Sequence, residues 1–272
     1  GSAKARVFNE AGTLLYSRQT GGEMPVAERS LGSYRTLLPL QVPAGQTVQV
    51  YLQLSGRVSY YRPDKVELRL LPPGSYEQEK DWRLFGQGIF LGIIMVMALY
   101  NLLFFLAVRD ISYLWYVLSI AGVGLYFSFF YGFNLEYLWP GSPIWDLHSF
   151  AFILSFTGVA RLLFTRSYLK TWQLLPRWNH FLSVLMALYL LPVLLGALSL
   201  AGLADLVPFL IQFIGAMGTL VLLTMLAAGL ASYRRGYRPA LIFIVANLLF
   251  ELGALLFIFR ETGWMPDNTF SR

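Results

Sequence analysis

The feature that most constrains this chain is a series of long apolar segments that carry almost no charge. Residues 84–108 and 111–135 are two such runs, each 25 residues long and without a charged side chain. A helix needs about 20 apolar residues to cross a bilayer core of roughly 30 Å, so these runs predict membrane-spanning helices. Six spans are predicted, at about residues 84–108, 111–132, 143–165, 179–199, 205–232 and 239–260.

The charged residues are distributed unevenly along the chain. They make up 13% of all residues, against about 25% in a typical soluble domain. Most of them lie before Arg83 or in short clusters between the apolar runs. This pattern predicts a soluble part joined to a membrane part.

The first 74 residues predict β structure. Apolar and mostly polar side chains alternate in residues 47–54 and 65–70, and a period of two places one strand face on a core and the other in water. Further strand candidates are residues 6–8, 13–17 and Tyr34–Val42. We therefore expect a membrane protein with an all-α helical bundle at 84–260, preceded by a partial β-sandwich or jelly-roll domain at 1–74 and a polar linker at 75–83. Five or six strands bury little area, so this sheet should pack on strands outside the chain or on the membrane domain.

Basic residues predict the orientation of the spans. They cluster in alternate connections, whereas the connections between them carry the acids Glu136 and Asp205. Basic connections lie on the cytoplasmic side, which places the β domain outside, in the periplasm of a Gram-negative cell. Lys80 and Arg83 oppose this orientation but are outnumbered. Six spans then leave residues 261–272 as an outer loop that leads towards a seventh span beyond the C-terminus. The basic residues are Arg109, Arg166, Lys170, Arg177, Arg234, Arg235 and Arg238.

Several classes of function lack the residues that they require. The chain has no cysteine, which excludes disulfides, thiolate catalysis and cysteine-ligated metals. No HExxH, GxSxG or P-loop pattern occurs. His148 and His180 are predicted at opposite ends of the membrane, too far apart for a haem pair or a two-histidine metal site. We expect no enzymatic activity, cofactor or metal here, and the net charge of +6 reflects topology and not nucleic-acid binding.

Four segments resemble those of one known group of proteins. The first is Thr20–Pro25 with Arg29 close behind, and the second is the helix Gly88–Asn101. The third is the Arg109-Asp110 turn with its following aromatic residues Tyr113, Trp115 and Tyr116, and the fourth is Gly132–Asn134 with Tyr137–Pro140. Over nearly its whole length the chain is similar to the bacterial seven-transmembrane receptors with diverse intracellular signalling modules.

This resemblance implies an extracytoplasmic jelly-roll sensor, similar to carbohydrate-binding modules, above seven helices. It also implies a cytoplasmic output: a histidine kinase of a two-component system, a diguanylate cyclase or a phosphatase. We expect the chain to lack the first strands of the sensor, the seventh helix and the output module, as a fragment of a longer protein would.

A few polar residues interrupt the predicted spans. Asn247 and Glu251 share one helix face, either as a switch or ion site or as a structural pair, and the second is the simpler interpretation. Arg161 either snorkels to the headgroups, which its position near the cytoplasmic end favours, or pairs with Glu251. Asn101 is expected to donate an interhelical hydrogen bond. Gly88 and Gly92 permit close helix contact, within the bundle or across a dimer, and packing within the bundle is favoured.

The β domain offers few candidates for a ligand site. Glu23, Glu28 and Arg29 either line a cleft or form an ordinary solvated loop. Tyr60, with Tyr51 and Tyr61, either stacks on a sugar or packs on the sheet.

We therefore interpret the chain as a receptor of the bacterial inner membrane. It senses a carbohydrate-like or other extracytoplasmic ligand and regulates cytoplasmic signalling proteins through an output module that is absent here. Membrane lipid and a second copy in a homodimer are its other expected partners. The alternatives are a transporter or channel for ions or small molecules, and a membrane enzyme. The catalytic inventory disfavours the enzyme.

Overall fold

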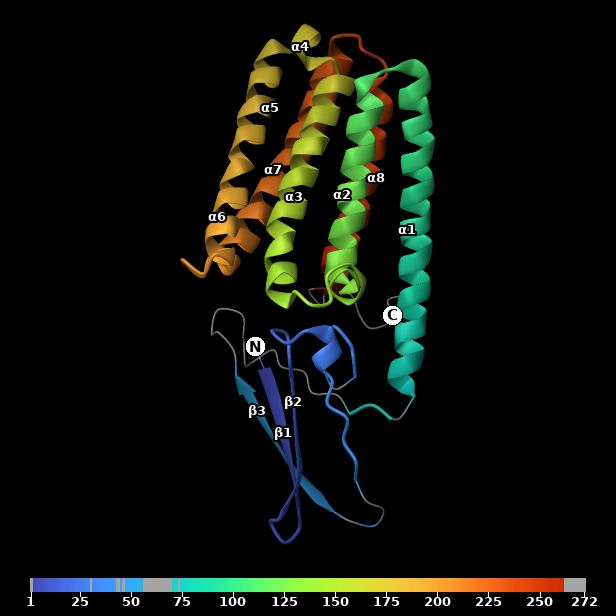
Figure 1. The fold of residues 1–272 in the computed structure, drawn as a ribbon. Helices are drawn as coiled ribbons and strands as arrows, with labels where there is room; N and C mark the ends of the chain where they lie inside the picture. The colour runs from blue at the N-terminus through green and yellow to red at the C-terminus, as the bar shows by residue number, and fades with distance from the viewer. Residues whose placement is uncertain are drawn as a thin grey trace.

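The protein consists of a small β domain at one end of a helical bundle (Figure 1). This computed structural model describes residues 2–29, 31–42, 45, 47–55, 70–72 and 74–261, with side chains up to Gly253. Below, the end of the bundle next to the strands is called the sheet end, and the opposite end is called the far end.

The β domain contains one antiparallel sheet in the described residues. Its strands are β1 (Ser2–Asn9), β2 (Leu14–Gly21) and β3 (Val48–Ser55), and β1 lies in the centre. Ala3, Ala5 and Val7 of β1 are buried, whereas Arg6 between them is exposed. This alternation is the period-two pattern of a strand with one covered face. The prediction that the N-terminal region contains β structure is confirmed at these three strands.

The strand expected at Tyr34–Val42 is wrong, because this segment is a loop. Its backbone groups bond elsewhere: the amide of Tyr34 donates to Glu136, and the amide of Arg35 donates to Ser33 Oγ. Pro39 has no amide to offer to a ladder. The other expected strand, at residues 65–70, lies almost entirely outside the described residues.

Eight helices follow, and they form the bundle. Five segments in the described residues are long and apolar enough to cross a membrane: α1, α2, α3, α7, and α5 with α6 taken together. α8 has 22 residues, with an apolar described part at Ala240–Gly253. The helices are α1 (Ser75–Val108), α2 (Ile111–Phe130), α3 (Pro143–Tyr168), α4 (Thr171–Leu174), α5 (Pro176–Leu188), α6 (Leu190–Leu200), α7 (Val207–Arg234) and α8 (Ala240–Glu261), with short turns at η1 (Val26–Glu28) and η3 (Asn134–Leu138).

The linker expected at 75–83 is also wrong, because these residues form the first turns of α1. The helix begins directly after Gly74, which takes a left-handed conformation with φ of 86°. It then continues without a break for 34 residues to Val108. A helix of this length measures about 50 Å, so α1 extends beyond a bilayer core and carries its polar first turns alongside the β domain.

The predicted fourth span is a helix with a break. α5 ends at Leu188 and α6 begins at Leu190, so Tyr189 separates them. Pro192 explains the break, because a proline has no amide to donate and its ring clashes with the carbonyl four residues earlier. That carbonyl belongs to Leu188, the last residue of α5. The break places the Tyr189 side chain in the interior, where only 3% of it is exposed.

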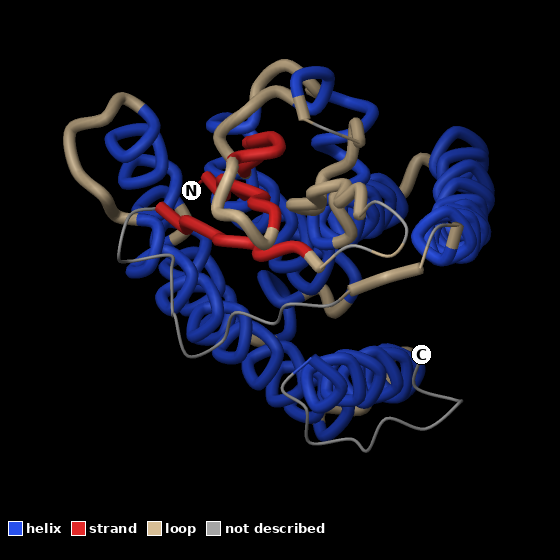
Figure 2. The backbone as a smooth tube through the Cα atoms, turned by 90° about the horizontal axis from the view of Figure 1, so that it is seen from below, coloured by secondary structure: helices blue, strands red, loops and turns tan. Residues whose placement is uncertain are grey.

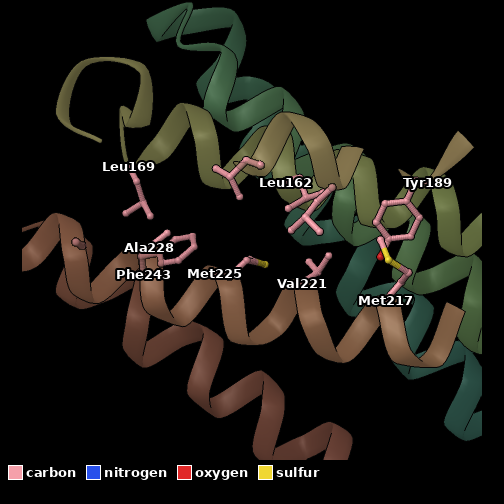
Figure 3. Packing of buried hydrophobic residues seen from close by; sticks show 11 residues of the cluster. Leu162, Leu169, Tyr189, Met217, Val221, Met225, Ala228 and Phe243 are labelled. Atoms are coloured by element: carbon pink, nitrogen blue, oxygen red, sulfur yellow. The ribbon is translucent and has the colours of Figure 1, made fainter. Parts of the chain in front are cut away.

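The main apolar core lies where α3, α5, α7 and α8 meet (Figure 3). Leu162 of α3 and Leu169, directly after this helix, face Val221, Met225 and other side chains of α7 across this core. Glycines allow the helices to approach closely around it. An added Cβ at Gly229 of α7 would lie 2.9 Å from Ile244 of α8, and one at Gly122 of α2 would lie 2.2 Å from Thr157 of α3.

α1 and α8 lie at the two ends of the row of packed helices. α1 packs on α2, and α8 packs on α7; Figure 2 shows the bundle from the sheet end, with the strands in front of the helices. A Cβ added to Gly88 or Gly92 of α1 would meet no atom within 4 Å. The expectation that these glycines pack within the bundle is therefore wrong for the part of the chain that the structure describes, and dimer contact stays a prediction.

Gly122→Ala should destabilise the bundle by about 1–3 kcal/mol, the usual cost of overpacking. The new methyl group would meet both the side chain and the Cα of Thr157, so α2 and α3 must separate. Gly92→Ala is the matched control, because its methyl group enters open space and alanine favours the helix. Thermal unfolding in nanodiscs measures both. Equal melting temperatures for the two variants would contradict the close α2–α3 contact.

Candidate functional site: the joint between the β domain and the helices

The loop after β2 is shaped around one buried arginine. The guanidinium of Arg29 donates four hydrogen bonds to main-chain carbonyls, and only 5% of the residue is exposed. Burial lowers the pKa of Arg29, while Asp146 and Glu136 raise it; an arginine remains charged in either case. Its donors therefore serve the loop, and the expectation that Arg29 binds a ligand is wrong. The acceptors are the carbonyls of Gly22, Met24, Ser33 and Tyr34.

Tyr34 is the residue of this loop that enters the helical part. Its ring lies against Gly132, where an added Cβ would fall 2.1 Å from a ring carbon. Gly132 has a φ of +74°, a left-handed conformation that favours glycine. The Tyr34 amide donates to Glu136 Oε1 at 3.1 Å. Ring and backbone of one residue thus both dock on the connection between α2 and α3.

A buried ion pair closes this contact. Arg83 of α1 and Glu136 of η3 lie 3.0 Å apart, and their side chains are only 12% and 6% exposed. The Arg83 guanidinium also donates to the Tyr131 carbonyl and lies 4.7 Å above the Tyr34 ring. Three separate segments, the loop, α1 and the α2–α3 connection, therefore meet at this pair.

Further contacts surround the pair. The Val26 amide donates to the Pro140 carbonyl at 3.0 Å, and the Tyr76 hydroxyl donates to Ser33 Oγ at 2.5 Å. Arg35 pairs with Glu79 of α1, but these side chains are 42% and 51% exposed. We call the whole contact the joint: loop residues 26–35 against the first turns of α1 and residues 131–140.

A second set of polar contacts lies just inside the sheet end of the bundle. Trp139 Nε1 donates to Asp146 at 2.6 Å. The His148 ring contacts the Ile144 carbonyl through Nδ1 and the Ser199 hydroxyl through Nε2, which links α3 to α6. Among the described residues no three histidines or acids lie close enough to hold a metal ion.

The polar residues of α3 and α8 meet within the bundle. Arg161 lies 3.8 Å from Glu251 Oε1, and its guanidinium donates to Asn247 Oδ1 at 3.4 Å. It also lies 4.4 Å above the ring of Phe250. The expectation that Arg161 snorkels is therefore wrong for this conformation, and the alternative of pairing with Glu251 is what the structure shows. Asn247 and Glu251 do share one helix face.

The remaining predicted candidates lie apart from these sets of contacts or outside the described residues. Asn101 donates to the Met97 carbonyl of its own helix, so the expected interhelical bond is wrong. Glu23 and Glu28 are both exposed. Tyr60 lies outside the described residues, whereas Tyr51 packs edge-on against Phe8.

Sequence reasoning missed the residues that build the joint. Arg83 was counted only as a charge that opposes the predicted orientation, and Glu136 only as an acid between two spans. The positions of these two charges could have indicated the contact, because opposite charges at the same predicted membrane face can pair. Nothing in the sequence indicated Tyr34, whose role depends on how its loop folds. Gln87, which donates to Ser128 of α2, was also missed.

The fold and the joint define the class of the protein: a multi-pass helical membrane protein with a β domain locked to one end of its bundle. A comparison with protein families gives the particular group. Residues 83–272 match the family described as 7TM diverse intracellular signalling, so the chain belongs to this family of membrane signalling receptors. No curated protein and no solved structure matches the chain.

Arg83→Gln should increase hydrogen exchange at the Tyr34 amide on the order of tenfold, which corresponds to about 1.4 kcal/mol. The substitution leaves Glu136 buried without its cation, and broken buried pairs are strongly destabilising. Arg35→Gln is the matched control in the same loop, and it should change the rate by about twofold or less because exposed pairs contribute little. Exchange followed by mass spectrometry in nanodiscs measures both. An unchanged rate in Arg83→Gln would show that the pair does not hold the joint.

Proposed function

We propose that this chain is the sensing and transmitting part of a receptor of the bacterial inner membrane. The β domain binds an extracytoplasmic ligand, and the helices pass a conformational bias to a cytoplasmic output module. The observation that carries this proposal is the joint, where a buried ion pair ties the loop of the β domain to two parts of the bundle. A β domain that was only tethered would not require such a contact.

The distribution of charge supports the orientation. The connections at the far end hold Arg109, Arg166, Lys170 and Arg235, and basic connections lie in the cytoplasm. Arg83, which opposes this rule, is neutralised by Glu136 within the joint. The β domain is then periplasmic and the far end faces the cytoplasm.

The joint provides a route for the signal. α1 is one unbroken helix from Ser75 to Val108, so a displacement of its first turns is carried along its length. Arg83 belongs to α1 and Glu136 to the α2–α3 connection, and the loop contacts both. A ligand that shifts the loop therefore shifts α1 relative to α2 and α3, provided that it binds two bundle states with different affinity.

The other partners follow from the family resemblance. Output modules of the kinase, cyclase or phosphatase type would receive the signal beyond the last helix, and the segment itself has no catalytic role. The ligand is carbohydrate-like or another small extracytoplasmic molecule, and the receptor acts as a homodimer surrounded by lipid. A transporter is the second candidate, but it would need polar residues along a path. The polar side chains of α1 and α3 instead bond locally to Ser128, Ser199 and Glu251.

Topology is tested by single cysteines, because the chain has none of its own. Cysteines that replace Ser2 or Pro140 should react with an impermeant maleimide in intact spheroplasts. Cysteines that replace Lys170 or Arg235 should react only after the membrane is opened, because basic connections face the cytoplasm. Labelling at residue 170 in intact spheroplasts would show that the true orientation is the opposite one. The β domain would then not be periplasmic, and the proposed sensor would be wrong.

Coupling is tested by breaking the joint and measuring at the far end. Spin labels at Val108→Cys and Gln173→Cys report the distance between the far end of α1 and α4, the short helix that directly follows α3. Glu136→Gln should shift this distance distribution, because the neutral amide of glutamine no longer pairs with the charge of Arg83 and accepts the Tyr34 amide more weakly.

Glu79→Gln is the matched control for that experiment, because it removes the same charge from an exposed pair and should leave the distribution unchanged. If Glu136→Gln frees the Tyr34 amide but does not alter the distance, the joint is only an anchor and the proposed transmission is wrong.

A further inference from the structure

The ion pair between α3 and α8 is the second place where charge is buried. Arg161 and Glu251 have side chains that are 14% and 15% exposed. Their closest atoms are 3.8 Å apart, which is an ion pair but longer than a hydrogen bond. In the described part of the chain Glu251 Oε1 is buried without a hydrogen-bond partner. The guanidinium of Arg161 and the carboxylate of Glu251 therefore attract each other through charge, without a direct hydrogen bond between them.

A second position of the Arg161 side chain follows from its depth in the membrane. It lies about two helical turns before α3 ends at Tyr168, close to the far-end membrane surface. An arginine at this depth reaches the headgroup region with its long side chain. The structure instead shows the guanidinium turned towards Glu251, which lies about one turn deeper than Asn247 on α8. Two positions of the same side chain are thus available, and one of them is occupied.

The pair joins helices that are otherwise held by different neighbours. α8 packs closely on α7, where Gly229 receives Ile244 and Phe243. α3 packs on α2, α5, α6 and α7. At the depth of the pair, Arg161 reaches Asn247, Phe250 and Glu251 of α8 through its side chain alone. Nearer the far end, Phe164 and Tyr168 of α3 pack on Phe243 of α8, so release of the Arg161 side chain would free α8 from α3 only around Glu251.

The surroundings of Arg161 guide it towards the paired position. Gly158, one turn earlier on the same face of α3, lets the Tyr189 ring lie against the helix, since an added Cβ would fall 2.2 Å from that ring. The buried Tyr189 ring therefore packs on α3 one turn before Arg161. On α8 the Phe250 ring lies under the guanidinium, a favourable cation–π contact.

We propose that Arg161 is a two-position latch between α3 and α8. Paired with Glu251 it holds the two helices together, and released it reaches the far-end headgroups and frees α8 to move. Glu251 and Asn247 are the positioning residues that keep the latch closed. The role of the latch as a switch rests on the proposed receptor function, but its two positions are a property of the bundle.

The test measures the distance between α3 and α8 in the full chain in nanodiscs, with spin labels at two exposed positions, Phe156→Cys of α3 and Leu252→Cys beside Glu251 on α8. The parent should give one short distance. Glu251→Gln should add a longer distance and raise the ratio of long to short by about tenfold or more, because the closed state loses its charge attraction. Arg161→Gln/Glu251→Gln, which buries no charge and so should fold well, should also show the longer distance.

Rescue separates a latch from a packing contact. Asn247→Asp/Glu251→Gln moves the acid one turn along α8, to a position that Arg161 already reaches, and it should restore the single short distance. A single short distance in Glu251→Gln and in the double-neutral variant would overturn the latch. Failure of the rescue would overturn it as well.

These distances do not depend on the joint or on an output module. The proposed function is tested at Val108 and Gln173 after a change in Glu136, whereas the latch is tested at Phe156 and Leu252 after a change in Glu251. Either proposal can therefore fail while the other holds.

Discussion

The arrangement of the protein depends on one carboxylate at the edge of the bundle. Glu136 pairs with Arg83 and accepts a hydrogen bond from the amide of Tyr34. It therefore binds a side chain of α1 and the backbone of the β-domain loop at the same time. Because both charged side chains are largely removed from water, each would be left uncompensated if the other were lost. The exposed Arg35–Glu79 pair has no such consequence. The β domain is thus held in position by a contact that stabilises the structure only while both charged side chains are present.

The helices are held together by a different principle. Surrounding lipid is as apolar as the helix surfaces, so burial of leucine gives little drive for association, and close packing and polar contacts take its place. The glycines at helix contacts show this, because each admits a neighbouring side chain where a methyl group would collide. The polar bonds that cross between helices, such as Gln87 to Ser128 and His148 to Ser199, supply the second element. The positions concerned include Gly122, Gly124, Gly158 and Gly229.

The sequence predicted those features that depend on composition over a length of chain. Apolar runs located the long helices because a membrane span is defined by length and polarity alone, and β3 was located by its alternation. The prediction failed where tertiary contacts decide the local structure. The loop at Tyr34–Val42 has a strand-like composition, but its first amides bond to Glu136 and Ser33. Residues 75–83 have a polar composition suited to a linker, yet they are helical. Three of their side chains, those of Tyr76, Glu79 and Arg83, contact the loop of the β domain.

The candidate sites divide in the same way. Asn247 and Glu251 were found because two polar residues four apart on an apolar helix are visible in any sequence. Arg161 was found as well, but its partner could not be chosen, since snorkelling and pairing differ only in which helix lies nearby. Arg29 was expected either to line a cleft or to lie in a solvated loop, and it does neither, because a buried arginine that bonds to four carbonyls is indistinguishable, in sequence, from an exposed one.

α3 connects the two places where charge is buried. Its first residue, Pro143, follows closely after Pro140, whose carbonyl accepts the amide of Val26 in the joint. Arg161 lies about two turns before its other end. A helix does not compress, so a rotation or tilt of α3 that begins at the joint also moves Arg161 relative to Glu251. Glu251 belongs to α8, which packs on α7 and meets α3 through Phe243 nearer the far end. In the proposed transmission, the Arg161–Glu251 pair is therefore the place inside the bundle where a displacement of α3 would change the distance between two buried charges.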